Sequence, residues 1–476
     1  MAVLLETVRE RLVRRIRTKE ARVAILGMGY VGLPLAIAFA HNGFVTTGVD
    51  IDESKAQSLN QGRSYLGDIS DGEIVQQVVS KRFSATTDTA VLAECDCIII
   101  CVPTPLGRSD DPDLSCIIDA AQAVKAHLRP GQLIVLESTT YPGCTDELLR
   151  PALEETGLVL DRDFLLAFSP ERIDPGNARF KTINVPRIVG GCSADSTAAA
   201  AELYEQAVPS VHLVSSARVA EITKLLENTF RAVNIGLINE MALMCHRMNI
   251  DIWEVIDAAK TKPYGYMPFY PGPGIGGHCI PLDPAYLSWR GRQFGFVSDF
   301  IEVAERVNAS MPAHVVQLIA DGLNAAGKSL RDARVLVLGV TYKRDVPDAR
   351  ESPAIEVIQG LRAKKADVAY HDPFVPKLAF SPEHTKLRRE MMYSGKERRN
   401  GAMRQEAKQG RRTVDPLYSL PLSDAVLQQA DCVVIVTDHS CFDYERIARL
   451  ASIVVDTRNA ITEDLRRSSS AQFIRL

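Results

Sequence analysis

The chain has 476 residues, more than one hydrophobic core normally supports, so we expect two or three domains. With 46% hydrophobic and 24% charged residues it has the composition of a globular protein, and its formal net charge of −4 argues against a general nucleic-acid binder. The 10 cysteines form no CxxC pair, and no stretch reaches the roughly 18 uninterrupted apolar residues of a membrane span. We therefore predict a reduced cytoplasmic protein without a metal site and without a membrane or nucleic-acid partner.

Residues 1–20 are basic, but Glu and Arg alternate with Leu and Val, and the segment has neither a long apolar run nor a small-residue cleavage site. It is therefore not a signal peptide. We predict a short amphipathic leading helix that packs on its own domain, in preference to a helix on a membrane surface.

The next segment, residues 21–214, alternates short apolar runs with helical patterns. A run at 22–26 leads into the turn GMGYVG, a helical stretch closed by Gly43 follows, and a second run ends at Asp50. The strand–helix–strand pattern repeats in CIIICVPTP, a helix near 115–128 and QLIVLESTT. Strands that alternate with helices predict a doubly wound parallel sheet.

From Ser215 the pattern changes to a long helix without proline, which Ser215 or Ser216 can cap. Its apolar positions occupy more than one face, as suits the middle of a molecule or a dimer interface. The loop KPYGYMPFYPGPGIGGHCIPLDP at 262–284 follows. We assign residues 215–325 to a central helical domain that carries this loop.

A second α/β segment covers residues 326–476, with strand candidates in RVLVLG, ADVAYH, DCVVIV and SIVVD. Residues 386–412 do not fit it, because they are strongly basic with few apolar anchors. We predict a solvated insertion there, and contact with an acidic partner or a partner subunit is the alternative.

The turn GMGYVG has the spacing of a dinucleotide-binding turn. Gly27 permits the tight turn, Gly29 lets the backbone approach a pyrophosphate, and Gly32 allows close packing of helix on strand. The turn lies between a strand and a helix, which is the context that this motif requires. Asp50 ends the second strand, where a carboxylate binds ribose hydroxyls and repels a 2′-phosphate, so NAD is favoured over NADP.

Cys279 is the candidate nucleophile. The glycines before it leave room for a ligand, and Pro281, Asp283 and Pro284 predict a helix start whose dipole favours a thiolate. His278 either tunes the thiol or only shapes the loop. The other nine cysteines lie mostly in apolar runs and are predicted to be buried bystanders.

Four further groups are candidates for the chemistry. Lys224 and Asn228 share one face of the long helix and could hold an oxyanion, although most helical lysines are simply solvated. Glu171 lies in the turn-rich SPERIDPGN, and ESTTYPG brings hydroxyls to a strand end. Lys343, Arg344 and Arg350 follow a strand and could clamp a diphosphate.

Together and in order, GMGYVGLPLA, CVPTP, ESTTYPG, SPER, KLLENTFRAVNIGLINE, PGPGIGGHCIPLDP and YKRDVPDARESPA resemble the UDP-glucose/UDP-mannuronate dehydrogenase family, from about residue 20 to the end. The sequence before Cys279, KPYGYMPFYPGPGIGGHC, is most similar to that of the UDP-N-acetylglucosamine 6-dehydrogenase branch. UDP-glucose and UDP-N-acetylmannosamine remain alternative substrates.

The resemblance implies two Rossmann-like doubly wound domains joined by a central long helix and helical domain. NAD binds the first domain and a UDP-sugar the second, in a homodimer or higher homo-oligomer serving surface polysaccharide synthesis. It also implies a four-electron oxidation through a thiohemiacetal and a thioester on Cys279. Lys224 and Asn228 would stabilise the oxyanion, Asp283 and Thr139 would handle protons, and Glu171 would assist hydrolysis.

The residues expected to bind ligands fall into two sets. The NAD site takes Gly27, Gly29, Tyr30, Val31, Gly32, Asp50, Pro103, Thr104, Thr139 and Arg350. The UDP-sugar site takes Glu171, Arg172, Lys224, Asn228, Phe269, Tyr270, Gly276, Tyr342 and Lys343.

The chain departs from the family in two places. The 386–412 insertion is longer than the family pattern, and Tyr264, Tyr266, Met267 and Phe269 stand where other branches carry an arginine that reaches the neighbouring subunit, so we assign no such arginine. Two rival functions stay open: a two-electron dehydrogenase of the hydroxyacid or 6-phosphogluconate type, and a non-catalytic NAD or UDP-sugar sensor.

Overall fold

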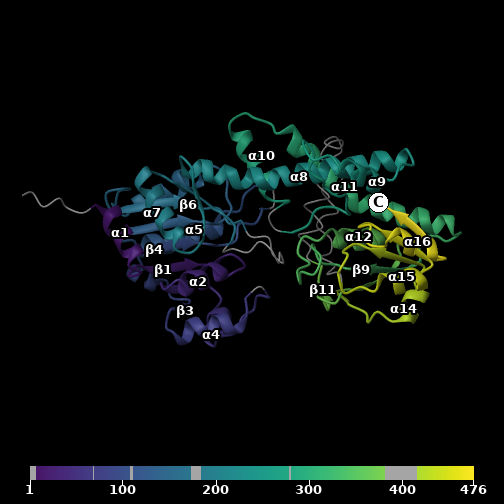
Figure 1. Ribbon diagram of the computed structural model, residues 1–476, viewed down its shortest axis with the longest axis horizontal. Coiled ribbons are helices and arrows are strands. Elements are labelled where there is room, and N and C mark those ends of the chain that lie inside the picture. The colour runs from purple at the N-terminus through teal and green to yellow at the C-terminus, as the bar shows by residue number, and fades with distance from the viewer. Residues whose placement is uncertain (1–6, 68, 108–110, 173–183, 278–279, 381–414) are drawn as a thin grey trace, which may run out of the picture. The chain divides into compact units, whose positions relative to one another are not determined.

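A computed structural model of the chain describes residues 7–67, 69–107, 111–172, 184–277, 280–380 and 415–476 (Figure 1). The chain divides into two compact units, which we describe one at a time. The first contains Met1–Glu227 and Trp289–Phe296, and the second contains Asn228–Ser288 and Val297–Leu476. The predicted insertion at 386–412 lies outside the described residues. The predicted four-part division of the chain stays a prediction.

The first unit is built on an eight-stranded sheet in the order β3-β2-β1-β4-β5-β6-β7-β8. Every neighbouring pair is parallel except β6 and β7. The strand order reverses between β1 and β4, which is where doubly wound sheets bind ligands at the carboxyl ends of their strands. The strands are β1 (Arg22–Leu26), β2 (Val45–Val49), β3 (Phe83–Thr86), β4 (Cys97–Ile100), β5 (Gln132–Leu136), β6 (Phe164–Phe168), β7 (Arg187–Gly191) and β8 (Val211–Leu213).

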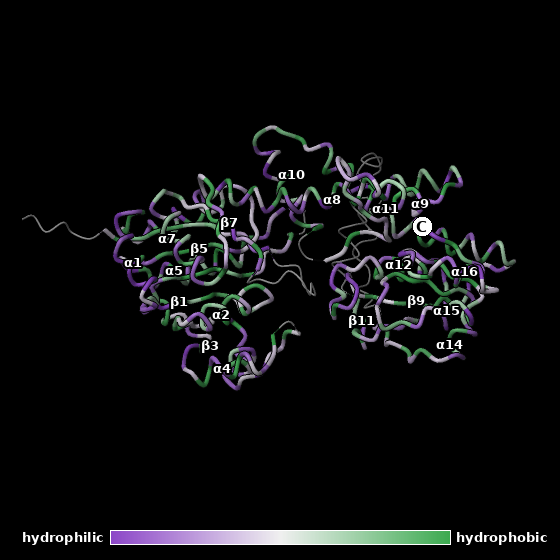
Figure 2. Tube along the Cα trace, viewed as in Figure 1, coloured by the Kyte–Doolittle hydropathy of each residue, from purple (hydrophilic) through white to green (hydrophobic). Residues whose placement is uncertain are grey.

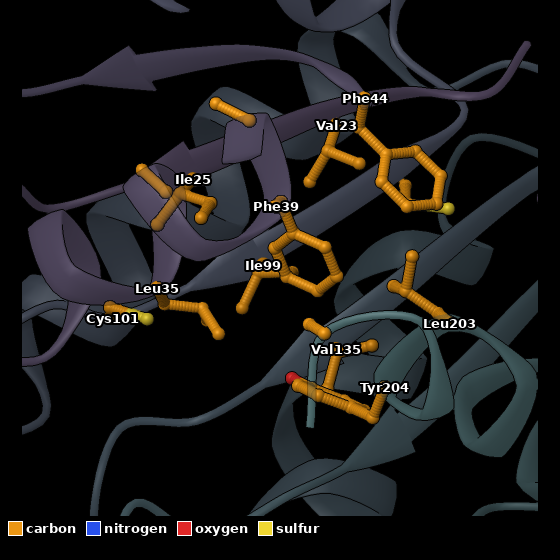
Figure 3. Packing of buried hydrophobic residues seen from close by; sticks show 14 of the residues in the cluster. Val23, Ile25, Leu35, Phe39, Phe44, Ile99, Cys101, Val135, Leu203 and Tyr204 are labelled. Atoms are coloured by element: carbon orange, nitrogen blue, oxygen red, sulfur yellow. The ribbon is translucent and has the colours of Figure 1, made fainter. Parts of the chain in front are cut away.

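Helices cover both faces of this sheet. The helices are α1 (Val8–Arg17), α2 (Gly32–His41), α3 (Glu53–Asn60), α4 (Asp71–Val79), α5 (Ser115–His127), α6 (Arg150–Glu154) and α7 (Ala194–Glu205), with the short η1 (Thr89–Glu94) and η2 (Thr145–Leu149). Successive strand residues point to opposite faces, so each face has its own core. Phe39 of α2 and Tyr204 of α7 pack over Val23, Ile25 and Ile99 on one face (Figure 3).

The leading helix is found as α1, between 8 and 17. Thr7 caps it in a capping box with Glu10, and its apolar residues Leu12 and Ile16 are buried in the first core. Arg17 pairs with Glu202 of α7 at 2.7 Å. The helix therefore packs on its own unit.

The second unit contains a parallel five-stranded sheet in the order β10-β9-β13-β14-β15. Its order reverses between β9 and β13, which again marks a ligand-binding edge. The strands are β9 (Arg334–Leu338), β10 (Asp367–His371), β13 (Cys432–Ile435), β14 (Ile453–Asp456) and β15 (Gln472–Arg475), beside the small pair β11 (Lys377–Leu378) and β12 (Leu417–Tyr418). Figure 2 shows mainly hydrophobic residues along β5 and β9, as buried parallel strands require.

The remaining helices include the long central one. They are α8 (Ala217–Arg247), α9 (Ile252–Ala259), α10 (Asp283–Gln293), α11 (Asp299–Ala325), α12 (Pro353–Ala363), α14 (Asp424–Gln429), α15 (Tyr444–Leu450) and α16 (Glu463–Ser468). The predicted cap of the long helix is confirmed, because the Ser216 hydroxyl accepts from the Val219 N–H at 3.3 Å. The predicted α/β class with two parallel sheets is also confirmed, apart from the antiparallel β6–β7 pair. No helix in the described part of the chain combines the length and the apolar character that crossing a membrane requires.

Candidate functional site

The glycine turn of the first unit has the geometry that its sequence predicts. A Cβ at Gly27, whose φ is +94°, would lie 2.5 Å from the Cys101 carbonyl oxygen, and one at Gly32 would lie 1.9 Å from that of Gly27. A Cβ at Gly29 would meet nothing within 4 Å. The tight turn and the close packing thus need glycine, while Gly29 faces open space. Helix α2 begins at Gly32 without a side-chain cap, so its first N–H groups can receive a phosphate.

Asp50 ties the end of β2 to this turn. Its Oδ2 accepts from the Met28 N–H at 2.8 Å, and its Oδ1 accepts from the Asp52 N–H at 3.0 Å. The Lys55 ammonium lies 3.1 Å from the carboxylate, which is 8% exposed. Tyr30 and Val31 lie in the glycine turn, and Pro103 and Thr104 follow β4 on the other side of the strand-order reversal. These residues fit a dinucleotide such as NAD.

We expect the Asp50→Ala variant to lose discrimination against NADP. Without the carboxylate, the Lys55 ammonium is released to pair with a 2′-phosphate, so the NAD to NADP ratio of kcat/KM should fall by about tenfold or more. Steady-state kinetics with both cofactors check this. Asp52→Ala is the matched control, because Asp52 caps the exposed start of α3 and should leave the ratio unchanged. An unchanged ratio in Asp50→Ala would remove the assignment.

A buried ion pair lies at the carboxyl ends of β5 and β6. Lys224 of α8 and Glu171, which follows β6, are each 6% exposed, and Nζ lies 3.4 Å from Oε2. The second oxygen of Glu171 is buried and has no hydrogen-bond partner among the described residues. Thr139 follows β5 in this unit and is half-buried. A buried carboxylate with an unsatisfied oxygen calls for a ligand or a water as partner.

Glu221, which the sequence analysis missed, anchors the turn that follows Thr139. Its carboxylate accepts from the N–H groups of Gly143 at 2.6 Å and Thr145 at 2.9 Å, and from the Thr145 hydroxyl at 2.6 Å. Burial is the main cause that raises the pKa of Glu221 to about 7. Because Glu221 precedes Lys224 by three residues on α8, it fixes this helix against the Thr139 turn. In the sequence, only the three-residue spacing from Lys224, which places both residues on one helix face, could have indicated Glu221.

The sequence analysis also missed Arg187 and Glu137, which fix the backbone directly before Glu171. The guanidinium of Arg187, the first residue of β7, donates to the Pro170 carbonyl at 3.1 Å and lies 3.3 Å from Glu137. The Tyr204 hydroxyl donates to the other oxygen of Glu137. Hydrogen bonds therefore hold both partners of the Arg187–Glu137 ion pair, and Pro170, directly before Glu171, is fixed by Arg187.

In the second unit, Asn228 and Asp283 are joined. The Asn228 side-chain amide donates to Asp283 at 2.5 Å, and Asp283 is 2% exposed at the first position of α10. The predicted helix start after the cysteine loop is thus confirmed. Cys279 and His278 themselves lie outside the described residues. Asn228 follows Lys224 by four residues on α8, as the helix period requires.

Gly276 and Gly277, which precede the cysteine, pack closely on the loop after β9. A Cβ at Gly276 would lie 2.6 Å from the Glu351 carbonyl oxygen and 2.9 Å from the Tyr342 Cβ. Gly277 has a φ of +90°, and a Cβ there would lie 3.0 Å from the Tyr342 ring. Gly276 and Tyr342, both predicted to bind the UDP-sugar, are therefore brought together.

The remaining predicted ligand residues have local partners. Arg172 pairs with Glu227 at 2.6 Å, Phe269 meets Phe230 edge-on at 5.8 Å, Tyr270 stacks on Trp253 at 6.1 Å, and Arg350 pairs with Asp348 at 2.7 Å. The Lys343 carbonyl accepts from Thr341 at 2.9 Å, and Arg344 of the predicted diphosphate clamp lies 3.3 Å from Asp438. Their roles stay predictions.

Most of the described cysteines are buried, as predicted. Burial raises the pKa of the Cys97 and Cys101 thiols well above its usual value, and that of Cys192 to about 12. Such thiols are poor nucleophiles at neutral pH. Across the described ranges, no group of three or more His, Cys, Asp or Glu side chains is placed to hold a metal ion.

Comparison with known families matches three consecutive stretches of the chain to one family. Residues 21–208 match the NAD binding domain of the UDP-glucose/GDP-mannose dehydrogenase family, residues 218–310 its central domain, and residues 336–463 its UDP binding domain. The glycine turn lies in the first match, Lys224, Asn228 and Cys279 in the second, and Tyr342 in the third.

Individual relatives agree with this match. UDP-N-acetyl-D-glucosamine 6-dehydrogenase of Pseudomonas aeruginosa is 35% identical over 75% of this chain and 84% of that protein. UDP-N-acetyl-D-mannosamine dehydrogenase of Pyrococcus horikoshii is 34% identical over 93% of this chain and 96% of its own length. A solved structure of the UDP-D-ManNAc dehydrogenase from Pyrococcus horikoshii superposes with a TM-score of 0.81 at 31% identity, covering 95% of this chain and 98% of that one.

Proposed function

This chain belongs to the UDP-glucose/GDP-mannose dehydrogenase family, and we propose that it oxidises the C6 hydroxyl of UDP-N-acetylglucosamine to a carboxylate with NAD, for surface polysaccharide synthesis. Family membership makes it an NAD-dependent oxidoreductase. The observation that carries the proposal is the buried Lys224–Glu171 ion pair.

NAD, held at the glycine turn and Asp50, supplies the hydride acceptor in both oxidation steps. The residues of the chain handle the protons and the oxygen. In the first step the alcohol loses a hydride and a proton, and Asp283 with Thr139 takes the proton. Lys224 and Asn228 stabilise the negative charge on the C6 oxygen, which a buried cation does more strongly than a solvated one.

The Cys279 thiolate then adds to the aldehyde carbon, and the resulting thiohemiacetal keeps the aldehyde from escaping. Loss of a second hydride from the carbon and of the proton from the hydroxyl converts this adduct to a thioester. Water attacks the thioester carbon, the carbon–sulfur bond breaks, and the acid leaves with the thiol regenerated. We propose that Glu171 orients that water; its second carboxylate oxygen, which has no hydrogen-bond partner among the described residues, supports this role.

The choice of sugar rests on the loop before Cys279 and on the Pseudomonas aeruginosa relative. UDP-N-acetylmannosamine is the second candidate, because a relative named for that substrate covers more of this chain at nearly the same identity. NADH formation with UDP-N-acetylglucosamine, UDP-N-acetylmannosamine, UDP-N-acetylgalactosamine and UDP-glucose tests the choice. We expect the highest kcat/KM with UDP-N-acetylglucosamine. A higher value with another sugar would overturn the specific assignment.

We also propose a homodimer or higher homo-oligomer. Large hydrophobic residues recur along α8 at Ile222, Leu226, Phe230, Leu237 and Met244, and each is at least 44% exposed. Their spacing of four and seven residues places them on one stripe, and a second copy of the chain would bury it. The cytoplasm is the proposed location, because the described cysteines are free thiols, as a reducing compartment favours.

The two rivals are weaker. A two-electron dehydrogenase would need neither a cysteine in a glycine loop nor a UDP binding domain. A sensor would have no chemical need for the buried Lys224–Glu171 pair, since burying charges costs stability.

A further inference from the structure

A fully buried histidine joins the ends of three strands in the second sheet. His439 follows β13, and its side chain is completely shielded from solvent. Its Nε2 lies 3.1 Å from a carboxylate oxygen of Asp372, which follows β10, and 3.2 Å from the hydroxyl of Thr341, which follows β9. The ring therefore lies at the reversal of strand order, where this class of sheet binds ligands.

The hydrogen bonds define an accepting and a donating end of the ring. Nδ1 accepts from the backbone N–H of Asp345 at 3.0 Å, and a backbone N–H can only donate. Nδ1 therefore carries no proton. The single ring proton is on Nε2, from which it is shared between Asp372 and Thr341. His439 thus bridges the loop with one accepting and one donating end.

Asp372 holds the start of the loop that follows β9, and His439 holds its end at Asp345. One of its oxygens accepts from the N–H groups of Val340 at 2.6 Å and Thr341 at 3.3 Å. The segment from Val340 to Asp345 is thus pinned by Asp372 at its start and by His439 at its end. Tyr342 and Lys343 lie between the two anchors, and Tyr342 packs on the glycines that precede Cys279.

We propose that His439 and Asp372 are positioning residues of the UDP-sugar site, which set the Tyr342–Lys343 turn without touching the ligand. This inference rests on the proposed function in so far as it assigns that turn to the UDP-sugar. It adds two buried residues that no sequence motif of the site contains. Their loss should weaken UDP-sugar binding while NAD binding in the other unit stays intact.

The test compares His439→Leu with Phe442→Leu in the full-length protein. Phe442 packs edge-on against His439 with ring centroids 5.2 Å apart, so both changes disturb the same buried cluster, but only the first removes the contacts of the ring with Asp372, Thr341 and Asp345. We expect His439→Leu to raise the KM for the UDP-sugar and the Kd for UDP by about tenfold or more, with the KM for NAD unchanged. Phe442→Leu should lower thermal stability and leave both constants within about twofold of wild type.

The His439→Asn variant tests whether one retained hydrogen bond restores part of the binding lost in His439→Leu, because the asparagine oxygen can still accept from the Asp345 N–H. Its Kd for UDP should lie between those of wild type and His439→Leu. An unchanged Kd for UDP in a folded His439→Leu protein, or an equal loss in Phe442→Leu, would overturn the inference. Calorimetry with UDP does not depend on turnover. A wild-type protein that binds UDP but oxidises none of the four UDP-sugars would contradict the proposed function alone.

Discussion

Cys279→Ser is expected to abolish acid formation while the first oxidation still occurs. A serine hydroxyl is almost never ionised at neutral pH, so it adds poorly to the aldehyde, and an oxygen ester hydrolyses more slowly than a thioester. Uronic acid production should fall by about 10³-fold or more. Rapid mixing should instead show a burst near one NADH per subunit. Mass spectrometry of the quenched protein and of the released sugar should find retained aldehyde or a bound adduct.

Cys192→Ser is the matched control for the same sulfur-to-oxygen change. Cys192 follows β7, which runs antiparallel to β6, so it lies toward the amino end of β6 and away from Glu171. Its half-buried thiol should be dispensable, and turnover should stay close to that of wild type. Normal acid production by Cys279→Ser would rule out the covalent mechanism.

Lys224→Met should have the second largest effect, on kcat. Methionine keeps the apolar stem of lysine but removes the cation that is proposed to hold the C6 oxygen. Loss of one such group usually lowers kcat by about 10²–10³-fold, and the KM for NAD should not change. Single-turnover measurements of the first hydride transfer locate the loss in the chemical step.

The variant also leaves Glu171 buried without its partner, which can cost about 3–5 kcal/mol of stability. The double variant Lys224→Met, Glu171→Gln removes this unpaired charge. If the cation acts on the oxygen, the double variant regains thermal stability but not the rate of the first hydride transfer, which does not depend on the hydrolytic role proposed for Glu171. Recovery of the first hydride-transfer rate in the double variant would show that Lys224 serves only to neutralise Glu171.

Local parts of the site were predictable from the sequence. The glycine turn, Asp50 and the four-residue spacing of Lys224 and Asn228 each depend on a short segment whose geometry follows from strand or helix periods. The start of α10 at Asp283 was likewise marked by its flanking prolines. In these places the residue types and their spacing already determine the backbone, and the structure agrees.

Partners that come from distant segments were not predictable. Glu171 and Lys224 are 53 positions apart, Glu221 and Gly143 are 78 apart, and Asp372 and His439 are 67 apart. Their contacts depend on the order of strands in each sheet, which no periodicity in a single chain reveals. The antiparallel β6–β7 pair was missed for the same reason, although it brings Arg187 to Pro170.

The most direct test of the central claim is the number of NADH formed per UDP-sugar consumed. Purified protein, limiting UDP-N-acetylglucosamine and excess NAD should give two NADH and one uronic acid per sugar, without free aldehyde. One NADH per sugar with release of an aldehyde would contradict the four-electron oxidation and with it the role proposed for Cys279.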